Sequence, residues 1–92
     1  MTKNLQKEIL KLYELYNSTD QQIIKKNLKS KFTERGLKQK FLAEILNITE
    51  VSAKPYFTLT HKTKPDLVNL IKIAEFMEFN ICDLFENIEE GN

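Results

Sequence analysis

The chain has 92 residues, enough for one domain with a modest core, and its apolar fraction of 41% is typical of a globular rather than a disordered protein. Only two glycines and two prolines leave little room for the turns of an all-β fold, and no apolar run is long enough for a membrane span or a signal peptide. The net charge of +1 conceals a strongly polar molecule, because residues 25–64 carry a balance of +7 and residues 65–92 a balance of −6.

This uneven charge is a first indication of a partner. A basic middle beside an acidic C-terminal third is the pattern expected of a protein that binds a polyanion such as a nucleic acid. The plain alternative is that the lysines only solvate helix surfaces. The single Cys82 cannot form an internal disulfide, which favours a reducing compartment, so we expect a cytoplasmic protein.

The N-terminal residues 1–19 carry one apolar stripe. Large apolar side chains recur there at alternating spacings of four and three residues, which is the period of a helix with one apolar face. The stripe consists of Leu5, Ile9, Leu12 and Tyr16. It predicts an amphipathic helix that either covers the core of its own bundle or pairs with a second chain, and this segment is a candidate dimerisation element. Phe76, Met77 and Phe79 form a second candidate dimer surface.

The second predicted helix spans residues 20–35, and a polar residue just before it can serve as its N-cap. The candidate caps are Ser18, Thr19 and Asp20. The residues expected on its buried face are Ile24, Leu28 and Phe32. Gly36 is expected to end this helix, because glycine readily adopts the left-handed conformation found after helix C-termini.

The remaining pattern predicts further short helices. A third helix over residues 38–46 places Phe41, Leu42, Ile45 and Leu46 inward, and a fourth lies within residues 50–60. Asp66 can cap the next helix, whose expected buried residues are Leu67, Leu70, Ile71 and Ala74. Asn80 begins a last turn that seals the core with Ile81, Leu84 and Phe85, and residues 87–92 form a frayed polar tail. The prediction is an all-α bundle of five to six helices.

Two blocks of sequence carry a resemblance to a known family. They are "GLKQKFLAEILNIT" at residues 36–49 and "KTKPDLVNLIKIAEFMEFNICDLF" at residues 62–85. The chain resembles the phage Cro- and repressor-like helix-turn-helix family, the XRE-type DNA-binding domain. The resemblance implies a lambda-repressor-like helix-turn-helix domain over residues 20–86, with the N-terminal helix as an addition. It also implies a homodimer that binds double-stranded DNA in the major groove, at the nucleoid.

In this family the second helix of the helix-turn-helix, here called the reading helix, enters the major groove. The corresponding helix of this chain, within residues 50–60, departs from the family pattern because Pro55 falls inside it. Proline in a helix interior removes one backbone hydrogen bond and costs roughly 3 kcal/mol. Two solutions are open. The helix begins at Thr49 and kinks or ends near Lys54, or it begins at Pro55, because the first position of a helix tolerates proline. We favour the later start, which makes "PYFTLTHK" the reading helix.

The resemblance and the basic charge together suggest DNA-contacting residues in three groups. The residues expected to bind phosphates at the start of the third helix are Lys38, Gln39 and Lys40. Those expected to reach base edges are Ser52, Lys54, Thr58 and Thr60. Those expected to contact the backbone of the opposite strand are His61, Lys62 and Lys64. The structural alternative is that the threonines only satisfy nearby carbonyls and the lysines are only solvated.

The sequence has no pattern that indicates an enzyme. It contains no set of metal ligands, no glycine-rich phosphate loop and no serine, histidine and acid in a plausible arrangement, so we expect neither a cofactor nor a metal. We therefore predict a sequence-specific DNA-binding transcriptional regulator, most simply a repressor. The alternatives are a DNA-binding accessory factor of a plasmid or mobile element, with a transfer or antitoxin role, and a protein-interaction module that has lost DNA binding.

Overall fold

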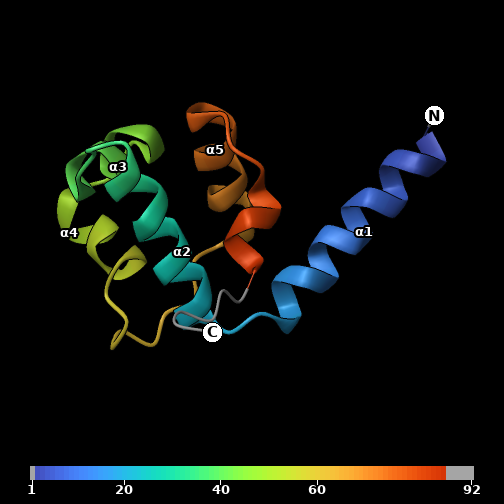
Figure 1. Cartoon of the computed structure of the whole chain (residues 1–92), viewed down its shortest axis with the longest axis horizontal. Helices are drawn as coiled ribbons and strands as arrows, with labels where there is room; N and C mark the ends of the chain where they lie inside the picture. Colours follow the sequence, from blue (N-terminus) through green and yellow to red (C-terminus); the bar gives the residue numbers. More distant parts are fainter. Residues whose placement is uncertain (1, 87–92) are drawn as a thin grey trace.

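The protein is all-helical over the residues that the computed structural model describes, residues 2–86, and its side chains are described from Leu5 onward (Figure 1). The α-helices are α1 (Thr2–Ser18), α2 (Gln21–Glu34), α3 (Gln39–Leu46), α4 (Glu50–Ala53) and α5 (Leu67–Met77). Two short 3₁₀ turns follow α4 and α5, namely η1 (Lys54–Tyr56) and η2 (Ile81–Phe85). The predicted all-α bundle is confirmed, and the tail expected at 87–92 lies outside the described residues.

Local sequence signals fix most helix boundaries. Asp20 is the N-cap of α2 and accepts a hydrogen bond from the backbone N–H of Gln22 at 2.8 Å. Asp66 caps α5 in the same way through the N–H of Asn69. Gly36 has a φ of +67° and follows α2 as expected, because glycine has no Cβ to strain this conformation.

The core lies between α2, α3, α5 and η2. Its fully or almost fully buried side chains are Ile24, Leu28, Phe32, Leu42, Ala43, Ala53, Leu70, Ile73, Ala74, Met77, Leu84 and Phe85. One expectation for α5 was wrong: Ile71 is 40% exposed, and Ile73 and Met77 are buried instead. The buried residues of α5 therefore extend to its C-terminal end, where η2 packs against the helix.

The helix α1 extends away from the bundle (Figure 1). Only its C-terminal half is anchored: Leu12 and Tyr16 pack on the core, and the ring of Tyr16 meets Phe85 edge-on with 6.3 Å between centroids. In the other half, Leu5 and Ile9 are 57% and 56% exposed. The predicted apolar stripe is thus divided between the chain's own core and an uncovered surface. No helix within residues 2–86 has the length and apolar character needed to cross a bilayer.

Candidate nucleic-acid interface

Helices α3 and α4 are joined by a tight turn at Asn47. Asn47 adopts the left-handed conformation with a φ of +56°, which asparagine tolerates better than most residues. The backbone N–H of Ile48 then donates to the carbonyl of Ala43 at 2.9 Å, which closes the end of α3. Thr49 caps α4, because its hydroxyl oxygen accepts the N–H of Ser52 at 3.1 Å. The result is two helices in a helix–turn–helix arrangement.

The favoured start of the reading helix at Pro55 was wrong, and the earlier start at Thr49 is the one observed. Helix α4 begins at Glu50, and at Pro55 it tightens into the 3₁₀ turn η1. Pro55 has no N–H to donate to the carbonyl of Val51, and the N–H of Lys54 donates to this carbonyl instead. The segment "TLTHK", expected to be helical, forms a turn and an irregular loop.

Gln39 connects the two helices of this arrangement. Its side-chain Nε2 donates to the backbone carbonyl of Glu50 at 3.1 Å, so the first residue of α3 holds the first residue of α4. The amide group expected to bind a phosphate therefore has a structural partner. Its position still places the beginnings of both helices side by side.

A groove of about 350 Å³ runs along α2, the start of α3 and η1. It is lined by Lys29, Phe32, Thr33, Leu37, Lys38, Gln39, Lys54, Phe57 and Thr58. Three lysines, one on α2, one just before α3 and one on η1, thus line one hollow with a partly apolar floor. Such an arrangement suits a phosphate, because each lysine supplies a positive charge and several donors.

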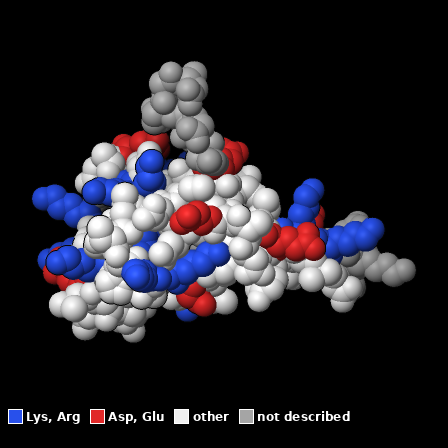
Figure 2. Space-filling view, turned by 90° about the horizontal axis from the view of Figure 1, so that it is seen from below, with Lys and Arg blue, Asp and Glu red and all other residues white. Residues whose placement is uncertain are grey.

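The ten basic residues of segment 25–64 divide into two kinds. Within residues 2–86, six of them have no hydrogen-bond or ion-pair partner for the side chain, namely Lys26, Lys29, Lys38, Lys40, Lys54 and Lys62. The other four hold the fold together, and three of these are described below. Figure 2 shows lysine and arginine side chains gathered over the end of the molecule away from α1.

Lys25 is fully buried and links α2 to the loop that follows η1. Its Nζ donates to the carbonyls of Thr58 and His61 at 3.1 and 2.6 Å, and so fixes the loop that follows η1. Burial lowers the pKa of the Lys25 ammonium below its usual value, because the charge is removed from water. The two carbonyls compensate part of that cost.

The side chain of Lys64, expected to contact DNA, contacts Tyr16 on α1. Its Nζ donates to the carbonyl of Tyr16 at 2.7 Å and lies 4.3 Å from the centre of the Tyr16 ring. The Tyr16 hydroxyl in turn donates to the carbonyl of Pro65 at 2.6 Å. Lys64 therefore anchors α1, and its ammonium group already has a structural partner; its expected role on the DNA backbone stays a prediction. Lys31 is similarly engaged, in an ion pair with Asp83 at 2.9 Å.

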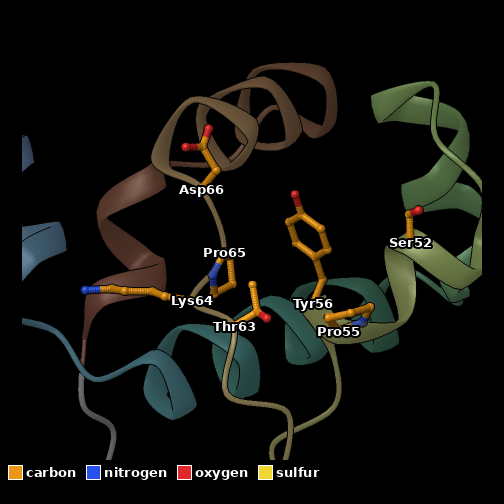
Figure 3. Close-up of a pocket in the computed structure, with 7 residues that line it drawn as sticks. All are labelled: Ser52, Pro55, Tyr56, Thr63, Lys64, Pro65 and Asp66. Atoms are coloured by element: carbon orange, nitrogen blue, oxygen red, sulfur yellow. The ribbon is translucent and has the colours of Figure 1, made fainter.

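Ser52 lies on a different hollow from the groove. This second hollow, of about 250 Å³, is lined by Ser52, Pro55, Tyr56, Thr63, Lys64, Pro65 and Asp66 (Figure 3). Its polar groups are largely engaged: the hydroxyl of Tyr56 accepts from Asn69 at 2.7 Å, Asp66 caps α5, and Lys64 points away from the hollow. Burial raises the pKa of the Tyr56 phenol. This hollow separates α4 from the start of α5 and offers few polar groups to a ligand.

The remaining expected residues differ in their surroundings. Thr58 lines the groove, but its hydroxyl donates to the carbonyl of Lys54 at 2.9 Å, which is the structural alternative considered for the threonines. Thr60, His61 and Lys62 are exposed in the loop after η1 and line neither hollow. Lys40 is exposed on α3 outside the groove. Lys38, Gln39, Lys54 and Thr58 are the expected residues that the structure brings together.

Three residues were missed by sequence reasoning. Lys29 and Thr33 lie on α2, outside the resembling blocks, and their spacing of four residues places both on the side of α2 that lines the groove. This spacing was a usable signal. Val51 on α4 is 81% exposed, an unusual position for a large apolar side chain that only the structure reveals.

Comparisons with protein-family models, with curated proteins and with solved structures find no match for this chain. No group of three or more histidine, cysteine, aspartate or glutamate side chains within residues 2–86 could hold a metal ion.

Proposed function

We propose that this protein is a sequence-specific double-stranded DNA-binding protein, a transcriptional regulator that represses by occupying its site, and that it acts as a dimer at the nucleoid. The single observation that carries the proposal is the groove lined by Lys29, Lys38 and Lys54, which lies beside the exposed start of α4 because Gln39 also lines it and holds Glu50. Phosphate contacts from these lysines would supply affinity and fix the position of the protein on the duplex.

The first turn of α4 supplies the groups that would read bases. Glu50, Val51 and Ser52 are exposed at its start, and Thr49 caps it without covering them. In the major groove, Val51 would contact a thymine methyl, Ser52 would bond a base edge and Glu50 would accept from cytosine. Because the anion-binding groove lies on the neighbouring elements α2 and α3, a phosphate held there would bring the duplex against α4.

The test is binding to duplex DNA over a range of salt concentrations, followed by selection of bound fragments from a random duplex pool. We expect affinity to fall steeply as salt rises and selection to return a palindromic motif, because a two-fold dimer reads two half-sites. Binding without any enriched motif would refute the sequence-specific function. Lack of binding even at low salt would refute DNA binding altogether.

A protein-interaction module without DNA binding is the second candidate. The observations that favour it are the absence of arginine from α4 and the exposure of Val51, since an exposed apolar residue also suits a protein partner. Changing Val51 to threonine separates the two candidates. A DNA reader would retain its salt-dependent affinity and alter its preferred motif, whereas an interaction module would show no affinity for duplex DNA with either residue at position 51.

A further inference from the structure

The uncovered half of α1 is the largest departure of this molecule from a self-sufficient bundle. Between Leu5 and Tyr13 four large apolar side chains are more than half exposed, namely Leu5, Ile9, Leu10 and Tyr13. Large apolar side chains left exposed along one helix indicate an interaction site, and Leu5 and Ile9 among them share one face. Because isolated short helices are marginal in water, this half of α1 also needs a partner to stabilise it.

The stripe on α1 is suited to pairing with another helix. Leu5 and Ile9 lie on the same face as Leu12 and Tyr16, and the spacings of four and three residues are those of the buried seam between two paired helices. Leu12 and Tyr16 already pack on the core, so the exposed Leu5 and Ile9 continue an apolar seam that begins inside the bundle.

The charges on α1 indicate which partner helix packs on the exposed stripe, namely a second copy of α1. Residues 2–11 carry a balance of +2, from three lysines and Glu8, whereas the rest of α1, residues 12–18, carries −1, from Glu14. A second α1 laid antiparallel therefore places each basic half beside an acidic half, twice. A parallel pair would place like charges together, which is unfavourable.

We propose that two copies of this chain associate through α1, with the two helices antiparallel and related by a two-fold axis. Leu5 and Ile9 of each copy pack near Tyr16 and Leu12 of the other, beside the place where α1 meets η2. The contact is self-complementary, so it closes at two copies instead of extending into a fibre. It leaves the groove of Lys29, Lys38 and Lys54 uncovered, because α1 extends from the opposite end of the molecule (Figure 1). The inference rests on the dimer named in the proposed function but not on DNA binding.

The first experiment measures mass in solution by sedimentation over a range of protein concentrations. We expect a dimer for the natural chain and a monomer for the double variant Leu5→Glu/Ile9→Glu. Leu10→Glu is the matched control: Leu10 is as exposed as these residues but lies away from the stripe, so this variant should remain a dimer. Far-UV circular dichroism checks that each variant is folded. A natural chain that is monomeric throughout, or a dimer that survives the double variant, overturns the proposal.

The second experiment determines the direction of the pair by disulfide cross-linking, with Cys82→Ser to remove the native thiol. In an antiparallel pair residue 6 lies near residue 13 of the other chain. A mixture of Gln6→Cys and Tyr13→Cys chains should therefore cross-link to each other, and Gln6→Cys alone should not cross-link. Efficient cross-linking of Gln6→Cys to itself would show a parallel pair and overturn the proposal. Neither experiment contains DNA, so failure here is distinguishable from failure of the proposed function.

Discussion

The groove and the loop that follows η1 are both surrounded by basic residues, yet Lys25 and Lys64 at the loop serve a different purpose from the lysines of the groove. Around the groove, the ammonium groups of Lys29, Lys38 and Lys54 have no partner within residues 2–86. Around the loop, Lys25 and Lys64 donate to backbone carbonyls at 2.6 to 3.1 Å and hold distant segments together. The number of positive charges in a sequence therefore overstates the charge that is available to a ligand.

The largest expected effect is on the groove. Replacing Lys29, Lys38 and Lys54 together with glutamine should nearly abolish duplex binding at moderate salt, and the slope of log affinity against log salt should flatten by about 0.9 for each phosphate that is no longer neutralised. Binding is measured by fluorescence anisotropy with labelled duplex. Lys72→Gln is a single-charge control on α5. If the triple variant retains the natural slope, the phosphates are held elsewhere.

The next effect is on stability, through the buried Lys25. Lys25→Met should lower the free energy of unfolding by about 2 kcal/mol, because two carbonyls are deprived of a charged donor in a site that water does not reach. Lys26→Met, one residue along α2 and exposed, should change it by less than about 0.5 kcal/mol. Urea unfolding gives both values. Equal stability of the two variants would show that Lys25 is not needed to fix the loop.

Two neighbouring lysines give a sharper contrast. Lys64→Met should cost about 1 kcal/mol of stability, because it removes the hydrogen bond and the ring interaction with Tyr16, and it should leave the salt dependence of DNA binding unchanged. Lys62→Met should do the reverse, with little change in stability and a weaker affinity for duplex. The comparison between groove and loop fails if Lys64→Met alters the salt slope.

The smallest effect is on alkaline stability. Burial, with a smaller contribution from Asp66, raises the pKa of Tyr16 above its usual value of about 10. The unfolded chain therefore loses this proton at lower pH than the folded protein, so the stabilisation is complete below about pH 10 and is lost as pH rises through the folded pKa. Tyr16→Phe should reduce the loss of stability between about pH 9 and about pH 11, measured by urea unfolding. Part of the alkaline loss of stability should remain in Tyr16→Phe, because burial also raises the pKa of Tyr56.

The sequence was most informative where structure is set by neighbours along the chain. The caps at Asp20 and Asp66 and the left-handed residue Gly36 are local effects, and each was expected from residue type. Predictions for residues 55–64 were poorer. The conformation of that segment depends on Lys25 and on the contact of Tyr56 with Asn69, and these partners are distant in sequence.

The candidate site shows the same division. Lys38, Gln39 and Lys54 were predicted because they lie in or beside the resembling blocks, whereas Lys29 joined them only when α2 was placed against α3 and η1. The hydrogen bond of Lys64 to Tyr16 likewise appeared only when α1 was placed against the loop after η1.

By itself the sequence determined the helical class, the order of the helices, the caps of α2 and α5 and the concentration of positive charge in the middle of the chain. Apolar periodicity and capping depend on residues a few positions apart, so they can be read directly from the chain. Only the tertiary structure decided which lysines remain free and which half of α1 is left uncovered. Both depend on the packing of segments far apart in sequence, since a side chain is engaged or exposed according to what the fold places next to it.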